Sequence, residues 1–237
     1  MTYNERFDKR KFDQLRPIEA KAGVIKNADG SAWFKIGKTE AYAAVYGPRD
    51  LFPRFLQDPA KGILRCYYNM MPFSGSGDRV RPGQNRRAKE ISLVTEKALL
   101  PVLDLSDTPN AVVDVFIDLP QTDAGSRCAG ICAAAIALAD AGITMKDMVS
   151  AVAVGRVDDK VVADLEYKEE AYEDGPVADI PLAVIQNTEK ISLLQMDGEI
   201  SKEMLIKALQ MGIKVSKEIH KVQLAALKNK YSEGDSK

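Results

Sequence analysis

The chain has 237 residues, of which 46% are hydrophobic, so it can bury a substantial core as one large domain or two small ones. Its 33 basic and 34 acidic residues leave a net charge of −1, which excludes recruitment of nucleic acid by a global positive field. No window approaches 18 uninterrupted apolar residues and the first residues are charged, so we expect no membrane span or signal peptide, and a cytoplasmic location.

The first half of the chain alternates between strand-forming and helical stretches. Strands are predicted within residues 22–46, 65–74 and 111–120, and helices within 85–100 and 126–142. Asp29-Gly30 between β-prone runs is a strong hairpin signal. In the first helical stretch, apolar residues recur at helical spacing until Pro101 ends the pattern.

The second half shows several strands before one long helix. Strands are predicted within residues 149–157, 159–167, 179–187 and 190–196. Ser201 is placed to cap the helix, and the polar tail 228–237 is expected to fray. Each half therefore consists of strands followed by a helix. This pattern favours an α+β fold with an internal duplication, in which residues 1–142 and 143–237 are subdomains of one compact globule.

Cysteine and histidine usage limits the chemistry. Cys66, Cys128 and Cys132 contain no Cys-x-x-Cys pair, which argues against a disulfide framework and against a structural zinc site. His220 is the only histidine and lies in an amphipathic segment, so a histidine base is not favoured.

The turn at Gly125, Ser126 and Arg127 is a candidate anion site. It stands where a predicted strand leads into a helix, and free backbone N–H groups and the helix dipole favour an anion at such a start. The serine hydroxyl and the arginine fork add donors that suit phosphate. In the alternative interpretation, Ser126 only caps the helix and Arg127 is a surface residue.

A basic loop precedes the first long helix. Between residues 78 and 89 it contains Arg79, Arg81, Arg86, Arg87 and Lys89. Such a cluster suits a phosphodiester backbone, although most basic loops are simply solvated. Arg86 and Arg87 stand at the start of the helix, where a cation interacts unfavourably with the helix dipole unless an anion or a carboxylate compensates its charge.

An acidic segment lies between two predicted strands of the second half. Its carboxylates are Glu169, Glu170, Glu173, Asp174 and Asp179. Carboxylates near phosphates hold divalent metals, and oxygen ligands favour Mg²⁺ or Mn²⁺. Most acidic loops are only soluble surface, but Asp179 begins an apolar strand and is therefore expected at the sheet rim, facing a cleft.

Together these three segments suggest a site for two phosphate groups and a metal. Two unit charges about 4 Å apart repel by roughly 4 kcal/mol at an effective dielectric of 20, so arginines and a metal are needed to bring two anions together. This is chemistry for phosphate attacking a phosphodiester.

The sequence resembles the ribonuclease PH family. The matching segments follow the family order over nearly the whole chain: FDQLRPIEAKAGVIKNADGSAWFKIGKTEAYAAVYGPRD, RCYYNMMPFS, RRAKEISL, DLPQTDAGSRCAGICAAAIALADAGI, ADLEYKEEAYEDGPVADIPLAVI and KISLLQMDG. Within that family it is most similar to catalytic subunits of archaeal exosomes. The resemblance implies a duplicated α+β fold of the ribosomal protein S5 domain 2-like type, and 3′-to-5′ exoribonuclease activity by phosphorolysis, with inorganic phosphate as co-substrate and nucleoside diphosphates as products.

The resemblance also implies roles for the basic residues. The family's phosphate-binding Gly-Thr/Ser-Arg motif falls on residues 125–127. Arg87, with Arg86 beside it, matches an arginine implied to contact phosphate or the terminal nucleotides of RNA, and Arg65 matches a position implied to contact the RNA backbone.

The acidic residues fit the family pattern less completely. Asp179 matches the essential aspartate, which implies metal binding or protonation of the leaving oxygen. Asp174 is our second catalytic and metal-binding candidate, but it lies five residues before Asp179 where the family commonly has six, and Glu170 is another candidate. Pro181 stands where ribonuclease PH itself usually has asparagine.

The partners implied for an exosome subunit are single-stranded RNA, an inactive paralogue that alternates with it in a hexameric ring of three heterodimers, and RNA-binding cap subunits. Two alternatives are a homohexamer of the ribonuclease PH type that trims transfer RNA ends, and a non-catalytic RNA-binding ring paralogue. The second is expected to lack the serine-arginine turn or the rim aspartate, and this chain has both.

Overall fold

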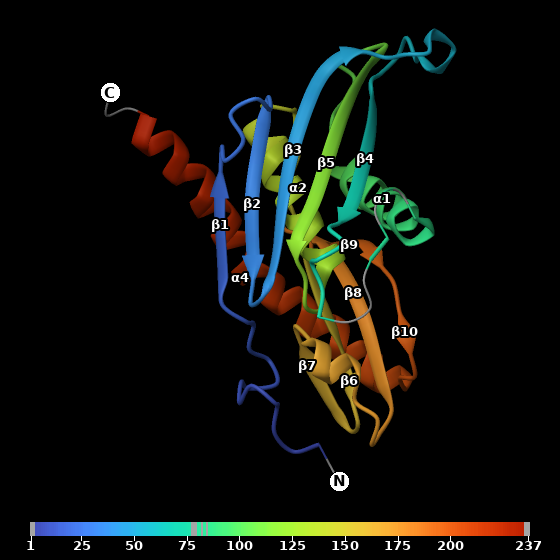
Figure 1. The fold of residues 1–237 in the computed structure, drawn as a ribbon, viewed down its shortest axis with the longest axis vertical. Helices are drawn as coiled ribbons and strands as arrows, with labels where there is room; N and C mark the ends of the chain where they lie inside the picture. The colour runs from blue at the N-terminus through green and yellow to red at the C-terminus, as the bar shows by residue number, and fades with distance from the viewer. Residues whose placement is uncertain (1–2, 77–79, 82, 84, 235–237) are drawn as a thin grey trace.

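The computed structural model describes residues 3–76, 80, 81, 83 and 85–234. Within this part the chain forms two sheets and four α-helices, arranged as in Figure 1. Arg79 of the expected basic loop lies outside the described residues. The two sheets and four helices confirm the α+β class predicted from the sequence.

The first sheet contains five strands in the order β1-β2-β3-β5-β4. The strands are β1 (Ile18–Ala22), β2 (Gly30–Ile36), β3 (Thr39–Asp50), β4 (Ile63–Met70) and β5 (Ala111–Gln121), with a 3₁₀ turn, η1 (Arg54–Leu56), between β3 and β4. Neighbouring strands are antiparallel except β4 and β5, which run parallel. Helix α1 (Arg86–Leu99) and the 3₁₀ turn η2 (Leu100–Val102) lie in the crossover that joins this parallel pair.

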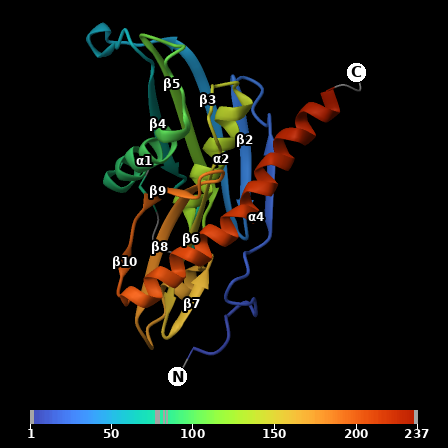
Figure 2. The same ribbon diagram turned by 180° about the vertical axis from the view of Figure 1, so that it is seen from behind.

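The helices of the first half pack on one face of this sheet. Asn85 caps α1 by accepting the backbone N–H of Ala88 at 2.7 Å. Helix α2 (Ser126–Asp140) is rich in alanine and almost wholly buried, because small side chains let it lie close against both sheets. Figure 2, seen from behind, shows α1, α2 and the last helix on this side of the strands.

The second sheet has the order β10-β8-β6-β7, with β9 paired to β8. Its strands are β6 (Val149–Val157), β7 (Lys160–Ala163), β8 (Val177–Ile185), β9 (Lys190–Leu194) and β10 (Asp197–Gly198), all antiparallel. A one-turn helix, α3 (Tyr167–Glu170), stands between β7 and β8, where the sequence predicted strand and loop.

The final helix, α4 (Lys202–Gly234), lies behind the sheets in Figure 1 and runs diagonally across the front of them in Figure 2. Ser201 caps it by accepting the N–H of Met204 at 3.4 Å, as the sequence predicted. The expected fraying from residue 228 was wrong as far as residue 234, because Lys230 forms an ion pair with the buried Asp140 and so holds the last turns against α2.

One hydrophobic core extends through both halves. It includes inward residues of the first sheet, most of α2, β6 of the second sheet and the apolar face of α4. A smaller cluster joins Tyr3 to Val157, Val162 and Leu165, so the N-terminal segment packs on the second half. None of the helices in the described ranges has the length and hydropathy needed to cross a bilayer.

Candidate functional site

A pocket of about 740 Å³ opens where the two halves meet. The lining side chains used below are Arg87, Arg127, Tyr167, Glu170, Asp179 and Gln195. They come from the start of α1, the start of α2, helix α3, the beginning of β8 and the segment after β9. The sheets thus bring segments from both halves of the sequence together at the helix α2 N-terminus.

The turn before α2 has a geometry suited to an anion. Gly125 precedes the helix with φ of 69°, a left-handed conformation that glycine adopts without steric cost. Ser126 is the first helical residue, so the interpretation of Ser126 as the helix cap is wrong. Its hydroxyl is buried and accepts a hydrogen bond from the hydroxyl of Tyr68 at 2.9 Å. The first N–H groups of a helix have no partner within the helix. Of the three motif residues, Arg127 lines the pocket, whereas Gly125 and Ser126 are not among its lining residues.

Two arginines line the pocket from separate helices. Arg127 donates to the Gln195 side chain, which in turn donates to Glu90 Oε1 at 3.0 Å. Arg87 forms no hydrogen bond or ion pair with any other described residue, and it is exposed at the start of α1. Its charge is therefore available to an anion in the pocket.

Asp179 is the best placed acid. It lies on β8 opposite Asp197 of β10, and its Oδ1 is buried without a hydrogen-bond partner in the described part of the chain. Burial raises its pKa to about 6, and Asp197 adds to that rise, while Arg127 and Arg87 oppose it. A buried carboxylate oxygen without a partner is expected to acquire a proton or a cation when substrate enters.

Glu170 is the second acid of the pocket. Burial raises its pKa to about 7, the charge of Asp179 raises it further, and Arg16 and Arg87 lower it. It ends α3, whose capping box joins Glu166 and Glu169. The sequence signal for α3 is the spacing Glu166-x-x-Glu169, and it was missed. A capping box usually has serine or threonine at the first position, and here that position is a glutamate.

The structure does not bring all predicted residues together. Asp174 is exposed between α3 and β8 and does not line the pocket, so the loop geometry favours Glu170 as the partner of Asp179. Arg65 lies on β4, where it forms a bidentate pair with Asp114 at 2.8 and 3.0 Å, away from the pocket. Arg86 lines a neighbouring pocket of about 360 Å³ with Tyr68 and Met70, and Arg87 borders both.

The carboxylates of the pocket fit a divalent cation only in part. No group of three or more histidine, cysteine, aspartate or glutamate side chains with metal-binding geometry occurs within residues 3–76, 80, 81, 83 and 85–234. Mg²⁺ is commonly held by one or two carboxylates together with substrate phosphates, however, and Asp179 and Glu170 supply two. Asp174 is not placed to share such an ion.

Comparison with known proteins identifies the family. Models of the 3′ exoribonuclease family match residues 14–144 (domain 1) and 147–215 (domain 2). Exosome complex component Rrp41 of Thermococcus kodakarensis is 48% identical over 227 residues, which cover 96% of this chain and 90% of that protein. The protein of the same name in Nitrosopumilus maritimus is 44% identical and covers 96% of this chain and 91% of its own length.

Solved structures show the same fold. Rice (Oryza sativa) Rrp46 superposes with a TM-score of 0.83 at 24% identity, over 94% of this chain and all of that one. A chain of the Archaeoglobus fulgidus exosome with RNA bound to the active site superposes with a TM-score of 0.77 at 22% identity, over 92% of each chain. The two family models cover most of the chain and the relatives cover nearly all of it, so the chain belongs to the 3′ exoribonuclease family, the ribonuclease PH family that its motifs indicated.

Proposed function

We propose that this chain is the catalytic subunit of an archaeal exosome, which shortens single-stranded RNA from its 3′ end by phosphorolysis in the cytoplasm. The observation that carries the proposal is the meeting of Arg87, Arg127 and Asp179 in one pocket at the start of α2. The relatives named Rrp41 support the choice of subunit.

In the proposed reaction an oxygen of inorganic phosphate attacks the phosphorus of the last phosphodiester linkage. The bond from that phosphorus to the O3′ of the preceding nucleotide breaks, O3′ takes up a proton, and a nucleoside diphosphate leaves. The protein contributes mainly positioning and charge neutralisation. We assign the attacking phosphate to Arg127 and the start of α2, and the scissile phosphate to Arg87; support comes from both arginines lining the pocket.

Asp179 has one of two roles, protonation of the leaving O3′ or binding of a divalent cation. Its raised pKa of about 6 leaves about a tenth of it protonated at pH 7, which suits a general acid. A bound Mg²⁺ or Mn²⁺ would instead neutralise charge on the two phosphates. For that role we propose Glu170 in place of Asp174 as the second carboxylate, because Glu170 lines the pocket.

The proposed partners are an inactive ring paralogue, alternating with this chain in a ring of three heterodimers, and RNA-binding cap subunits. Support comes from the face of the first sheet that no helix covers in Figure 1. Tyr67 stacks on Phe116 there with ring centroids 4.9 Å apart, and Tyr46 packs against the same ring. Arg49 packs over the Tyr46 ring at 5.6 Å, and Arg49 and Arg65 both pair with Asp114. This face therefore suits RNA bases or a partner subunit.

The test is an assay on radiolabelled RNA with and without phosphate, and with and without the ring partner. Phosphorolysis predicts nucleoside diphosphates that form only when phosphate is present. Nucleoside monophosphates that form regardless of phosphate would establish hydrolysis instead. Full activity of the chain alone, as a homohexamer, would favour the transfer RNA-trimming alternative.

The role of Asp179 is tested by Asp179→Asn in the assembled complex. We expect RNA binding to persist and diphosphate release to fall by about 10² or more, since the amide neither donates an acidic proton nor binds a cation well. Asp174→Asn is the matched control, and we expect its rate to stay within about twofold of wild type because Asp174 lies outside the pocket. Near-normal turnover by Asp179→Asn would remove Asp179 from the active site.

A further inference from the structure

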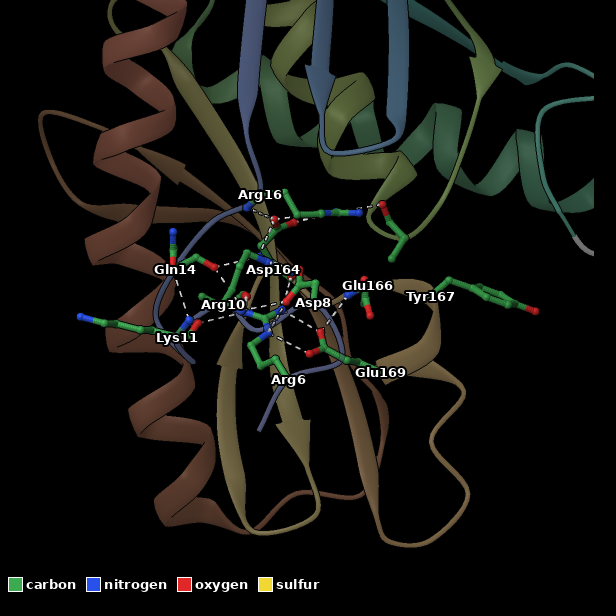
Figure 3. A network of polar contacts seen from close by, with 12 residues as sticks. Arg6, Asp8, Arg10, Lys11, Gln14, Arg16, Asp164, Glu166, Tyr167 and Glu169 are labelled. Carbon is green, nitrogen blue, oxygen red and sulfur yellow. Dashed lines mark hydrogen bonds and ion pairs between the residues drawn. The ribbon is translucent and has the colours of Figure 1, made fainter. Parts of the chain in front are cut away.

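The N-terminal segment, residues 3–16, lies against the second half of the molecule beside the site. Figure 3 shows Arg6, Arg10 and Arg16 of this segment gathered around Asp164, the residue that follows β7. Asp164 is buried and has φ of 53°, so its position is set by these contacts and by its own N–H, which donates to the carbonyl of Ala153 at 2.7 Å. Asp164 therefore anchors the segment.

Arg16 makes the most complete contact with this anchor. Its guanidinium donates to both carboxylate oxygens of Asp164, from Nε at 2.9 Å and from Nη2 at 2.7 Å, and its backbone N–H donates to Oδ2 at 2.7 Å. Only 6% of Arg16 is exposed. A buried bidentate pair of this kind fixes the plane of the guanidinium.

The fixed guanidinium reaches the phosphate-binding turn. Arg16 Nη2 donates to the carbonyl of Ala124 at 3.2 Å, and the hydroxyl of Thr39 donates to the same oxygen at 2.9 Å. The Thr39 hydroxyl also accepts the N–H of Asp123 at 3.0 Å. A Cβ on Gly125 would lie 3.5 Å from Arg16 Nη2, so the guanidinium lies directly beneath the turn.

The same contacts extend to the helix that carries Glu170. Arg16 Nη1 lies 3.6 Å from Asp123 Oδ2, and Asp123 Oδ1 accepts the N–H of Tyr167, the first residue of α3, at 3.3 Å. At the other side of α3, Arg6 forms a fully buried pair with Glu169 at 2.7 Å. The segment thus contacts both the anion-binding turn and the acidic helix.

We propose that Arg16 is a positioning residue for the phosphate-binding turn, holding Asp123–Gly125 against Asp164 so that the start of α2 and helix α3 face each other across the pocket. Arg16 does not line the pocket itself, so we expect it to act on phosphate through the turn. Its charge also lowers the pKa of Glu170, and Arg16→Lys keeps that positive charge. The inference rests on the proposed function, since it concerns the attacking phosphate of that reaction.

Lysine cannot replace the arginine in this position. A single ammonium group can pair with Asp164 but cannot also hold two carboxylate oxygens and the Ala124 carbonyl in one plane. The turn would then lose one of the two donors to that carbonyl, Thr39 being the other. The loss should appear in the binding of phosphate and leave the binding of RNA unchanged.

The experiment compares Arg16→Lys with Arg10→Lys. Arg10 is the matched control, since it also donates to Asp164, at 3.1 and 3.3 Å, but makes no hydrogen bond or ion pair with the turn or α3 among the described residues. Diphosphate release by the assembled complex is measured against phosphate concentration at saturating RNA, and then against RNA at saturating phosphate. Amide hydrogen exchange of residues 122–128 is measured on the same proteins.

For Arg16→Lys we expect the KM for phosphate to rise about tenfold, with the KM for RNA within about twofold of wild type and faster exchange of residues 122–128. Arg10→Lys should leave the KM for phosphate and the exchange of residues 122–128 as in wild type. Unchanged phosphate KM and exchange in Arg16→Lys, or equal changes in both variants, would overturn the inference.

Two further arms separate this inference from the proposed function. Wild type that releases no diphosphate overturns the proposed function, and the exchange rates of residues 122–128 then decide the role of Arg16. If Arg16→Lys does not fold, Thr39→Val is used, because it removes the other donor to Ala124. A phosphate KM and exchange rates equal to wild type in Thr39→Val would overturn the proposed positioning of the turn.

Discussion

Removal of one partner from the buried pair of Arg6 and Glu169 should be among the most destabilising single changes in this protein, and the variant that tests this is Arg6→Met. Both side chains are fully buried, and Arg6 donates to Glu169 Oε1 at 2.8 Å and Oε2 at 2.7 Å. It also donates to the carbonyls of Ala163 and Asp164, both at 2.8 Å. Methionine fills a similar volume, but among the described residues it leaves the carboxylate with two donors, the Tyr3 hydroxyl and the N–H of Glu166.

Removal of one partner from a buried ion pair costs about 3–5 kcal/mol. Each of the two carbonyls that loses a buried donor adds about 1 kcal/mol, so we expect Arg6→Met to lower the free energy of unfolding by at least about 5 kcal/mol. Replacing both partners, in Arg6→Met with Glu169→Met, removes the uncompensated charge. The double variant should therefore be more stable than the sum of the two single changes predicts, by about 2 kcal/mol.

The measurement is urea unfolding at pH 7 of wild type, the two single variants and the double variant. Lys217→Met is the control, since Lys217 forms an ion pair of 2.6 Å with Glu189 in which both side chains are 53% exposed. Such a pair contributes less than about 1 kcal/mol. A cost below about 1 kcal/mol for Arg6→Met, or additive costs in the double variant, would refute the reasoning.

Two further predictions concern the acid pair and the glycines. Because burial raises the pKa of Glu170 to about 7, folding holds its proton more tightly than the unfolded chain does, so wild-type stability falls as pH rises from about 4.5 to 7. Glu170→Gln lacks this loss, and its unfolding free energy relative to wild type should increase from pH 5 to pH 8; a difference independent of pH would contradict this. Gly155→Ala should prevent folding, since its Cβ would lie 1.9 Å from the carbonyl oxygen of Ala178. In Gly125→Ala the new Cβ has no contact under 3.5 Å, so the free energy of unfolding should fall by only about 1–2 kcal/mol, because of the positive φ. Thermal unfolding of the soluble proteins checks both, and a folded Gly155→Ala protein of wild-type stability would refute the close approach.

The sequence predicted the elements of the fold well because most of them carry local signals. Alternating apolar residues marked β5, helical spacing and Pro101 marked α1, and Ser201 marked the start of α4. Helix α3 was missed because it is a single turn whose formation depends on the buried Arg6 and Glu169 pair. The persistence of α4 to residue 234 depends on Asp140, 90 positions before Lys230, and no local pattern indicates such a contact.

The sequence predicted part of the pocket lining among both the cations and the acids, since Arg65, Arg86 and Asp174 do not line the pocket. Arg87, Arg127 and Asp179 were identified from their places at helix starts and at a strand rim, and all three line the pocket. Asp174 was named as the second acid although its five-residue spacing from Asp179 departs from the family pattern, and Glu170 was kept as another candidate. Position along an irregular loop does not fix the direction of a side chain. Helix α3 turns Glu170 inward, whereas Asp174 stays exposed. Gln195 and Tyr68, which contact Arg127 and Ser126, carry no sequence signal of that role.

The charges of the pocket predict how bound phosphate or a bound cation would change the pKa of Asp179. Without substrate, Arg127 and Arg87 hold the pKa of Asp179 below the value that burial alone would give. A phosphate bound to both arginines neutralises that effect and adds negative charge nearby, so the pKa of Asp179 must rise and its protonated form becomes more abundant when a leaving oxygen needs a proton. A divalent cation shared by Asp179 and Glu170 would lower the pKa instead. Bound phosphate therefore shifts the titration of Asp179 upward and a bound cation would shift it downward, so the pH dependence of turnover at low and high Mg²⁺ separates the two proposed roles.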